Sequence, residues 1–558
     1  MTVSEFIASF LSEQGVTDTF GIPGGVILDL IYAFNSTQDI TPHLCYHEQS
    51  AGFAANGYAQ SSNKLGVAYA TKGPGFTNLI TAIADAYYDS IPVLYITAHT
   101  ASTLPQGCRL VADQDMDTCS MINNITKYAK RVDCIDEIIP SVEEAVKIAT
   151  DGRKGPVFLD IAAYLFKKEI SINVPSPPKK ELKKDNALQL ASLVCNKIKN
   201  AQRPIILVGD GVNLSNTPEH LRIFIEKAQI PVLSSRYSHN IAAGSQYYYG
   251  YVGSHGIRYA NFILSKTDLI IALGNRLYFP PQSESFKKIV QQATFLRFDV
   301  DKGELLRHNE MPTGYEIDLE SLMPVLAEKV TDCGNHLEWC NICNKIYQNL
   351  LHQDMNETVL YISQLLKSIP SNWTLVSDVG NNEFWVSQAC VHSKIKNRTL
   401  YSKSFGALGN ALGKAIGAYY ATQNPVIVFI GDQGLQINLQ ELQYIVQHKL
   451  PIAIVVLNNF SSGMIKDREE AMGYKFSLHT TLESGYSVPI LFNIAHAYGI
   501  IYKTQEQITC LSQLSSPLFI EVKVSESLSL APSLPKGRDC QDMEPSLEVF
   551  LYNKLNEL

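Results

Sequence analysis

Short runs of apolar, β-branched residues alternate with helical patterns along nearly the whole chain. Examples are PVLYITA, DLIIALG and PVIVFIGD, from the first, middle and last parts of the sequence. This alternation is typical of parallel sheets flanked by helices. The chain has 558 residues, well above the roughly 250 to 300 residues at which one hydrophobic core stops growing. We therefore expect an α/β protein with three consecutive domains.

Changes in composition predict where the domains begin and end. We expect an N-terminal domain over residues 1–172, a central Rossmann-like domain over 186–332, a C-terminal domain over 355–530 and a tail over 531–558. The stretch NVPSPPKKELKKDN, between the first two domains, is rich in proline and lysine, as interdomain linkers are. The first and third domains could be distant repeats of one fold, which a single sequence does not demonstrate.

Charge and hydropathy exclude several kinds of partner. The formal net charge is -8, whereas nucleic-acid-binding proteins favour a basic surface. No run approaches the roughly 18 apolar residues of a membrane span. The N-terminal MTVSEFIASFLSEQGV carries Glu5 and Glu13 and no basic segment, which indicates an amphipathic helix rather than a signal peptide. The 11 cysteines do not follow the regular spacing of a disulfide framework, which favours reduced thiols. We expect a cytoplasmic protein that binds neither nucleic acid nor membranes.

One cysteine cluster has two interpretations. Cys333, His336, Cys340 and Cys343 are close enough in sequence for a zinc site. A lone cluster of this kind lacks the paired spacing of known zinc fingers, however. HLEWCNICNKIYQNLL is also typical of a helix whose cysteines serve as small apolar residues. We favour a helix that joins the second and third domains.

Two polar strand ends in the last part of the chain indicate a metal site. In NPVIVFIGDQGLQINLQELQYIVQHKLPIAIVVLNN, one strand ends at Gly431 and Asp432, a helix follows through NLQELQYIVQ, and a second strand ends at Asn458 and Asn459. Parallel strands end on the same edge of a sheet, where open α/β folds bind ligands. We therefore expect Asp432 and Asn459 to converge. A carboxylate, an amide oxygen and a backbone carbonyl suit Mg²⁺ that keeps phosphate oxygens as its other ligands.

The segment HLCYHEQSAGFAANGYAQSS places Glu48 where a strand gives way to a helix. By itself, an acidic residue at a helix start is usually a cap or a partner of the helix dipole, worth less than about 2 kcal/mol. The role of Glu48 therefore depends on the motifs around it.

Several motifs together resemble one enzyme family. FGIPGG, HEQSAGFAANGYAQ and ATKGPGFTNLITAIADAYYDSIPVLYITA, with the Gly-Asp and paired asparagines of the last part, resemble the acetolactate synthases, which depend on thiamine diphosphate. The similarity spans essentially the whole chain. It implies a pyrimidine-binding (PYR) first domain, a Rossmann-like central domain and a diphosphate-binding (PP) third domain. It also implies thiamine diphosphate and Mg²⁺ as cofactors.

The reaction implied by the resemblance is decarboxylation of a 2-keto acid, with pyruvate as the expected substrate. The acyl carbanion is then transferred to a carbonyl acceptor. Glu48 matches the carboxylate that activates the cofactor, and Gln114 matches a glutamine near the reacting carbon. Because Glu48 and the metal site would come from different subunits, the resemblance implies a homodimer or homotetramer with active sites at the subunit interface.

The resemblance also assigns the residues that hold the cofactor. Asp432, Asn459 and the carbonyl of Ser461 match the metal ligands, and Leu408 matches a bulky residue that wedges the cofactor into a bent conformation. The other positions that match cofactor contacts are Gly24, Gly73, Gly380, Asn381, Asn382, Gly406, Gly431, Gln433, Gly434, Ser462, Gly463 and Met464.

The sequence departs from the family pattern at some positions. Gln433 stands where the family usually has a glycine, and Arg468 stands where acetolactate synthases usually have a tryptophan that shapes the acceptor pocket. An arginine there favours an anionic or polyhydroxylated acceptor. We take Gly25, Phe76 and Arg468 as candidate substrate contacts.

The sequence leaves flavin binding open. VGDGVNLS and GSHG lie where flavin-dependent relatives have a three-glycine run and a similar His-Gly pair. Asp210 interrupts that run, and a carboxylate beside the diphosphate of FAD would repel it. Arg276 is retained, but the second arginine that these relatives use is lacking.

Four functions stay open on the sequence. They are acetolactate-like carboligation, acyl transfer to a keto-sugar or another non-standard acceptor, simple 2-keto acid decarboxylation, and cofactor binding without catalysis. The lack of a His-His pair disfavours a decarboxylase of the pyruvate decarboxylase type. Glu48 favours catalysis over an inert homologue. A dinucleotide oxidoreductase is disfavoured, because no GxGxxG follows a strand with an acidic residue about 20 residues later.

Overall fold

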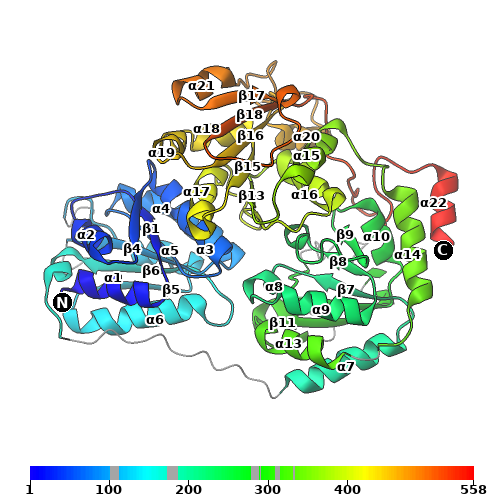
Figure 1. The fold of residues 1–558 in the computed structure, drawn as a ribbon, viewed down its shortest axis with the longest axis horizontal. Coiled ribbons are helices and arrows are strands. Elements are labelled where there is room, and N and C mark those ends of the chain that lie inside the picture. Colours follow the sequence, from blue (N-terminus) through cyan, green and yellow to red (C-terminus); the bar gives the residue numbers. More distant parts are fainter. Residues whose placement is uncertain (101–111, 172–185, 278–287, 290, 308–313, 331–332) are drawn as a thin grey trace.

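The computed structural model describes residues 1–100, 112–171, 186–277, 288–289, 291–307, 314–330 and 333–558. Within these residues, three six-stranded sheets follow one another along the chain, and all their strand pairs are parallel. Helices flank each sheet (Figure 1). The predicted fold class, three consecutive α/β domains with parallel sheets, is confirmed.

The first sheet has the strand order β2-β1-β3-β4-β6-β5. The central strands are buried on both faces, so they appear in the sequence as continuous apolar runs. The predicted N-terminal helix is present and starts with a capping box at Thr2. The elements are β1 (Asp18–Gly21), β2 (Thr41–Leu44), β3 (Gly66–Tyr69), β4 (Val93–His99), β5 (Tyr128–Val132), β6 (Val157–Ala162), α1 (Val3–Glu13), α2 (Leu28–Ser36), α3 (Glu48–Ser62), α4 (Pro74–Asp89), α5 (Thr118–Ile122) and α6 (Ile138–Thr150).

The second sheet has the strand order β12-β11-β10-β7-β8-β9. Read from the opposite edge, the strands follow the order 3-2-1-4-5-6 of doubly wound folds, with the switch point between β7 and β10. The predicted Rossmann-like sheet is therefore present. The elements are β7 (Pro204–Val208), β8 (Val232–Ser234), β9 (Tyr248–Tyr251), β10 (Leu269–Leu273), β11 (Thr294–Asp299), β12 (Gly314–Glu316), α7 (Ala187–Asn200), α8 (Gly211–Leu214), α9 (Pro218–Ala228), α10 (Arg258–Ser265), α12 (Lys302–Leu306) and α13 (Leu319–Lys329).

The third sheet has the strand order β14-β13-β15-β16-β18-β17. When the strands of each sheet are numbered from its own start, this order repeats that of the first sheet, as expected for two copies of one fold. The elements are β13 (Thr374–Ser377), β14 (Thr399–Leu400), β15 (Val426–Gly431), β16 (Ile452–Asn458), β17 (Ile501–Thr504), β18 (Leu518–Lys523), α15 (Glu357–Ser368), α16 (Asn381–Ser393), α17 (Ala411–Thr422), α18 (Asp432–Ile437), α19 (Glu441–Gln447), α20 (Gly463–Ala471) and α21 (Leu491–Ala497).

Helix α14 (Leu337–Leu350) connects the second and third sheets, as the helical interpretation of the cysteine cluster predicts. Cys340 and Cys343 lie on its buried face. The Cys340 thiol donates a hydrogen bond to the carbonyl of Gln229 at 3.4 Å, and the His336 ring bonds the carbonyl of Cys333 at 2.9 Å. These groups pack and hydrogen-bond as ordinary interior residues.

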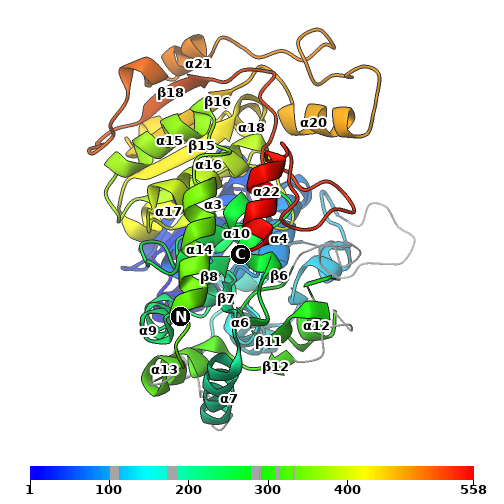
Figure 2. The same cartoon turned by 90° about the vertical axis from the view of Figure 1, so that its right-hand side faces the viewer.

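The C-terminal tail ends in α22 (Val549–Asn556), which lies beside α10 and α14 of the central part (Figures 1 and 2). The ring of Tyr552 lies 5.8 Å from that of Phe262, and Leu555 is fully buried. None of the helices in the described part of the chain has the length and apolar character needed to cross a membrane.

The first and third sheets are joined by the packing of α3 on α17. A methyl group added at Gly417 would lie 1.8 Å from the carbonyl oxygen of Ala54, so the two backbones touch. Lys414 of α17 reaches into this contact and lies 2.9 Å from Asp85, and both side chains are fully buried. The pair is enclosed between two domains, so its charges have little access to water.

Lys414→Met tests this ion pair. Removing the lysine strands the Asp85 carboxylate in the interior, and we expect a loss of about 3 kcal/mol in the free energy of unfolding, measured by urea denaturation. The double variant with Asp85→Asn removes the stranded charge and should recover part of the loss. Equal stability of Lys414→Met and the wild type would contradict this account.

Candidate active site

Asp432 lies at the carboxyl end of the third sheet, where β15 ends and α18 begins without an intervening loop. The side chain is almost fully buried, with 1% exposed. Its Oδ1 accepts a hydrogen bond from the Tyr486 hydroxyl at 2.8 Å, and its Oδ2 accepts one from the Phe460 N–H at 2.9 Å. Burial raises the pKa of Asp432 to about 6. A carboxylate this desolvated gains from a cation beside it.

The loop after β16 lies against Asp432, as the sequence predicts for neighbouring parallel strands. Asn459 and Ser461 are buried in this loop. A methyl group added at Gly463 would lie 2.5 Å from Asn459 Nδ2, so a larger residue there would displace the Asn459 amide. The Ser462 hydroxyl donates a hydrogen bond to Gln433 Oε1 at 2.9 Å. Gln433 therefore ties the two strand ends together where the family usually has a glycine.

A third strand end completes this edge. Gly380, with φ of 127°, precedes α16, and the Asn381 amide donates to Asp467 at 2.9 Å. The Asn382 amide donates to the carbonyl of Asp378 at 2.7 Å. Within the described residues, Asn381 Oδ1 and Ser461 Oγ are buried without a hydrogen-bond partner. Unpaired buried polar atoms are costly, so these two atoms are free to bind a polar ligand at this edge.

Asp378 shapes the segment that leads into α17. Its carboxylate accepts hydrogen bonds from the N–H groups of Gly409 at 2.8 Å and Ala411 at 3.0 Å. Burial raises the pKa of Asp378 to about 6, although these hydrogen bonds favour the charged form. Leu408 lies within the turn that they hold, and Gly406 has φ of 70°. Gly431 and Gly434 flank Asp432 on the same edge, and Met464 lies in the first turn of α20.

Glu48 is the first residue of α3, at the carboxyl edge of the first sheet. It is partly buried, and its Oε2 accepts a hydrogen bond from the Asn78 amide at 2.9 Å. A methyl group added at Gly75 would lie 3.4 Å from Glu48 Oε1, and one at Gly24 would lie 2.4 Å from Thr71. Both glycines therefore pack closely, Gly24 against Thr71 and Gly75 against Thr71 and the Glu48 carboxylate.

Gln114 and Gly73 lie against each other. A methyl group added at Gly73 would lie 2.8 Å from the Gln114 carbonyl oxygen, and Gln114 itself has φ of 60°, which is strained for a residue other than glycine. Lys72 donates to Thr100 at 2.6 Å and lies 3.2 Å from Asp115. The ion pair therefore fixes the residue next to Gln114.

Two candidate substrate contacts of the first domain differ in exposure. Gly25 is open, with no atom within 4 Å of an added methyl group. Phe76 has 0% exposure and packs against Phe158, with 5.3 Å between the ring centroids. The side chain of Phe76 is thus buried in the single chain, and its contact with a substrate stays a prediction. Phe76 follows Gly75 in the first turn of α4.

The regions of Glu48 and Asp432 approach each other through a hydrogen bond. The amide of Asn438, at the far end of α18 from Asp432, donates to Gln49 at 3.0 Å. Across the part of the chain that the structure describes, no hydrogen bond links the Glu48 side chain to the metal edge around Asp432. An active site shared between two copies of the chain therefore stays a prediction.

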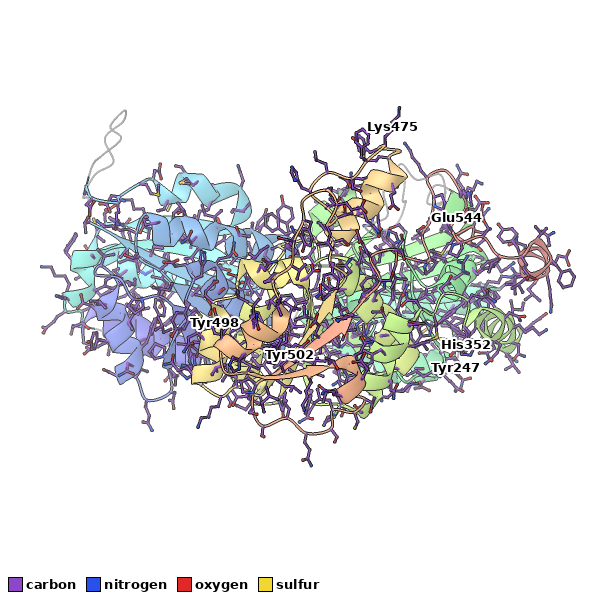
Figure 3. The ribbon with its side chains drawn as sticks, turned by 90° about the horizontal axis from the view of Figure 1, so that it is seen from above. Tyr247, His352, Lys475, Tyr498, Tyr502 and Glu544 are labelled. Atoms are coloured by element: carbon purple, nitrogen blue, oxygen red, sulfur yellow. The ribbon has the colours of Figure 1, made fainter. Side chains whose placement is uncertain are left out.

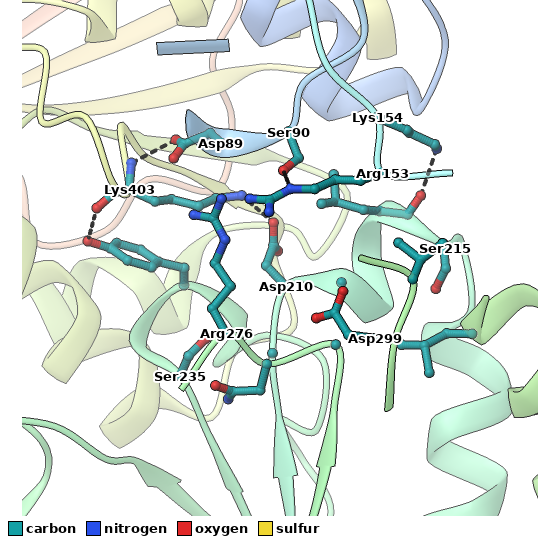
Figure 4. Close-up of a pocket in the computed structure, with 18 of the residues that line it drawn as sticks. Asp89, Ser90, Arg153, Lys154, Asp210, Ser215, Ser235, Arg276, Asp299 and Lys403 are labelled. Atoms are coloured by element: carbon teal, nitrogen blue, oxygen red, sulfur yellow. Dashed lines mark hydrogen bonds and ion pairs between the residues drawn. The ribbon is translucent and has the colours of Figure 1, made fainter. Parts of the chain in front are cut away.

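A cavity of about 830 Å³ lies where the three domains meet. It opens at the switch point of the second sheet, beside Asp210 and Arg276, and Figure 4 shows Arg276 and Arg153 reaching into it from different domains. Burial alone would raise the pKa of Asp210, but Lys403 and Arg398 outweigh burial and hold it below its usual range. Asp210 is therefore charged and neutralised by two cations.

The family models and relatives that match the chain agree with this geometry. The model of the thiamine pyrophosphate enzyme N-terminal TPP binding domain matches residues 1–121, that of the central domain matches 192–325, and that of the C-terminal TPP binding domain matches 378–516. The chain is 32% identical over 561 residues to the acetolactate synthase large subunit of Lactococcus lactis. This alignment covers 97% of this chain and 95% of the relative.

Two further relatives are similar over the same span. The chain is 29% identical to the acetolactate synthase isozyme 2 large subunit of Escherichia coli, over 97% of this chain and 99% of the relative. It is 28% identical to the chloroplastic acetolactate synthase 1 of Oryza sativa, over 97% of this chain and 87% of the relative. The chain belongs to the thiamine diphosphate enzymes of the acetolactate synthase type. The predicted family and enzyme class, a thiamine-diphosphate-dependent transferase, are confirmed.

Four residues near the half-sites were missed from the sequence. Tyr486, Asp378 and Glu441 carry no motif, and Tyr486 lies 54 residues from the carboxylate it contacts. Lys72 could have been recognised in the sequence, since it is a charged residue at the start of the glycine loop KGPG. The first three become visible only when the chain is folded.

Glu441 lies at the contact between the first and third domains, and its titration makes the free energy of unfolding depend on pH. Its Oε1 accepts a hydrogen bond from the Tyr46 N–H at 3.1 Å. Burial raises the pKa of Glu441 from 4.5 to about 7, despite this hydrogen bond. The folded state therefore holds a proton that the unfolded state releases between these pH values, and stability falls as pH rises through this window.

Glu441→Gln removes this titration. Relative to the variant, the wild type should lose up to about 3 kcal/mol of unfolding free energy between pH 4.5 and 7, measured by urea denaturation at several pH values. Glu143→Gln, at an exposed position of α6, serves as the control. A constant difference between wild type and Glu441→Gln across this range would rule out the shift.

Proposed function

We propose that the protein decarboxylates a 2-keto acid, with pyruvate as the substrate, and transfers the acyl carbanion to a carbonyl acceptor. The observation that carries this proposal is the match to acetolactate synthases along the whole chain, together with Glu48 at the start of α3. Bound thiamine diphosphate supplies an electron sink for the carbanion left by loss of CO₂. The working unit is a homodimer or a homotetramer, because each copy offers two separate half-sites.

The third domain would hold the diphosphate through a magnesium ion. Asp432, the amide oxygen of Asn459 and the carbonyl of Ser461 are the proposed Mg²⁺ ligands, which are hard oxygen donors that leave room for phosphate. The buried and unpaired Ser461 hydroxyl supports a polar ligand at this edge. Leu408 would pack against the middle of the cofactor.

The first domain would supply the proton chemistry. Glu48 would share a proton with a nitrogen of the pyrimidine ring, and Asn78 orients its carboxylate by a hydrogen bond of 2.9 Å. Gln114 would lie beside the reacting carbon, held there by its contact with Gly73 and by the neighbouring ion pair of Lys72 and Asp115. An inert homologue has no need of Glu48.

Glu48→Gln tests the catalytic role directly. The variant keeps the shape of the side chain but cannot share a proton as an acid does, so exchange of the cofactor C2 proton should slow by at least about 100-fold. NMR in deuterated water measures the exchange, and calorimetry should show cofactor binding near the wild-type level. Glu143→Gln is the control for a surface charge. Exchange at the wild-type rate would show that Glu48 is not the activating group.

The acceptor is proposed to be anionic or polyhydroxylated. Arg468 is exposed on α20, just beyond the metal loop, and within the described residues its side chain makes no hydrogen bond or ion pair. Its guanidinium is therefore available to a carboxylate, phosphate or hydroxyl group of an acceptor. A keto-sugar is the alternative to a second molecule of pyruvate.

Arg468→Trp restores the residue usual in acetolactate synthases. With labelled pyruvate and a panel of carbonyl acceptors, mass spectrometry should show kcat/KM for the preferred anionic or polyhydroxylated acceptor falling at least about 10-fold, as loss of a charged hydrogen bond implies. Release of CO₂ from pyruvate should persist. An unchanged acceptor profile would remove Arg468 from the acceptor site, and no CO₂ from any 2-keto acid would favour the inert homologue.

The cavity between the domains is the proposed place of a second cofactor. Its position at the switch point suits a nucleotide, and Asp299 at the end of β11 suits ribose hydroxyls. Its cations are already engaged, since Arg153 pairs with Asp301 and Glu304 and Lys403 pairs with Asp210. FAD and a flavin-free enzyme are thus the two alternatives, and the visible absorption of the purified protein distinguishes them.

A further inference from the structure

The carboxylate of Asp432 is held from two sides. The Phe460 N–H binds Oδ2, and the Tyr486 hydroxyl binds Oδ1, at 2.9 and 2.8 Å. An ionised carboxylate has about four lone-pair sites, so these bonds leave room for a cation while fixing the direction of the remaining lone pairs. The hydrogen bond from the Phe460 N–H follows from the positions of β15 and β16, which end side by side. The tyrosine bond comes from a separate segment.

Tyr486 closes a braced turn over residues 478–486. Its N–H donates to the carbonyl of Thr481 at 2.9 Å, and the Ser484 hydroxyl accepts from the N–H of Thr481 at 2.9 Å. The Thr480 hydroxyl donates to Glu469 of α20 at 2.8 Å, and the Thr480 carbonyl accepts from the Ser462 N–H at 2.8 Å. The turn is thus anchored to the helix and the loop that follow Asn459.

Polar bonds rather than apolar packing hold this part of the chain. Phe476 is 83% exposed and Leu478 is 69% exposed, so neither buries much surface against the domain. Lys475, in the same stretch, extends from the edge of the molecule (Figure 3). The hydrogen bond from Tyr486 to Asp432 is therefore a main tie between the turn and the metal edge.

We propose that Tyr486 is a positioning residue for the metal ligand Asp432. Its hydroxyl orients the carboxylate toward the cation, and it couples the turn over residues 478–486 to the loading of the site. Partners that orient a ligating group contribute to metal affinity even though they do not touch the metal. This inference rests on the proposed Mg²⁺ site and adds a residue that no motif of the chain marks.

Tyr486→Phe removes only the hydroxyl. In the full-length protein with thiamine diphosphate present, calorimetric titration with MgCl₂ should show the Kd for Mg²⁺ rising at least about 10-fold. Tyr474→Phe is the matched control, because Tyr474 is 61% exposed and, within the described residues, its hydroxyl makes no hydrogen bond. The control should bind Mg²⁺ like the wild type.

Tryptic cleavage after Lys475 gives a second readout that does not depend on turnover. Adding Mg²⁺ and thiamine diphosphate should slow this cleavage in the wild type and in Tyr474→Phe, and it should have little effect in Tyr486→Phe. If the wild type binds no Mg²⁺ with thiamine diphosphate, the proposed metal site itself fails. If the wild type binds but Tyr486→Phe matches Tyr474→Phe in affinity and cleavage, only the role of Tyr486 is refuted.

Discussion

The packing of α3 on α17 is the contact on which the rest of the structure depends. The two backbones touch at Gly417 and Ala54, so positions without side chains set the distance between the first and third domains. Helix α3 begins at Glu48, and the segment that enters α17 carries Leu408. One helix pair therefore places the candidate activating carboxylate of a chain relative to its own diphosphate-binding domain. Among the described residues no hydrogen bond links the Glu48 side chain to Asp432, which agrees with the proposal of active sites between copies.

Two buried carboxylates at the edge of the third sheet differ in what satisfies them. Asp378 and Asp432 follow neighbouring strands, and burial raises the pKa of each to about 6. Asp378 is satisfied by backbone N–H groups of the turn around Leu408, so it is a structural residue. Asp432 is held by one N–H and one hydroxyl, and no cation of the described chain pairs with it. A desolvated charge without a counter-ion is unfavourable, so Asp432 has the stronger physical reason to bind a metal.

The approach of Asp432 to the loop of Asn459 could be predicted from the sequence, because parallel strands end on one side of a sheet. Gln433 departs from the family pattern, and the hydrogen bond that it accepts from the Ser462 hydroxyl places it between the two strand ends. The substrate contact predicted for Phe76 stays a prediction. It lies in the glycine loop, and in the single chain its side chain is buried against Phe158.

The sequence by itself determined the three α/β domains, the family and the residue types at each half-site, because hydrophobic periodicity and motif spacing are properties of the chain. Only the tertiary structure decided which groups meet across domains. The ion pair of Lys414 with Asp85 and the hydrogen bond from Tyr486 to Asp432 each join residues that are far apart in sequence. The strand order that the first and third sheets share is likewise visible only in the fold. Such contacts depend on how helices cross and where loops return, and no local pattern encodes those distances.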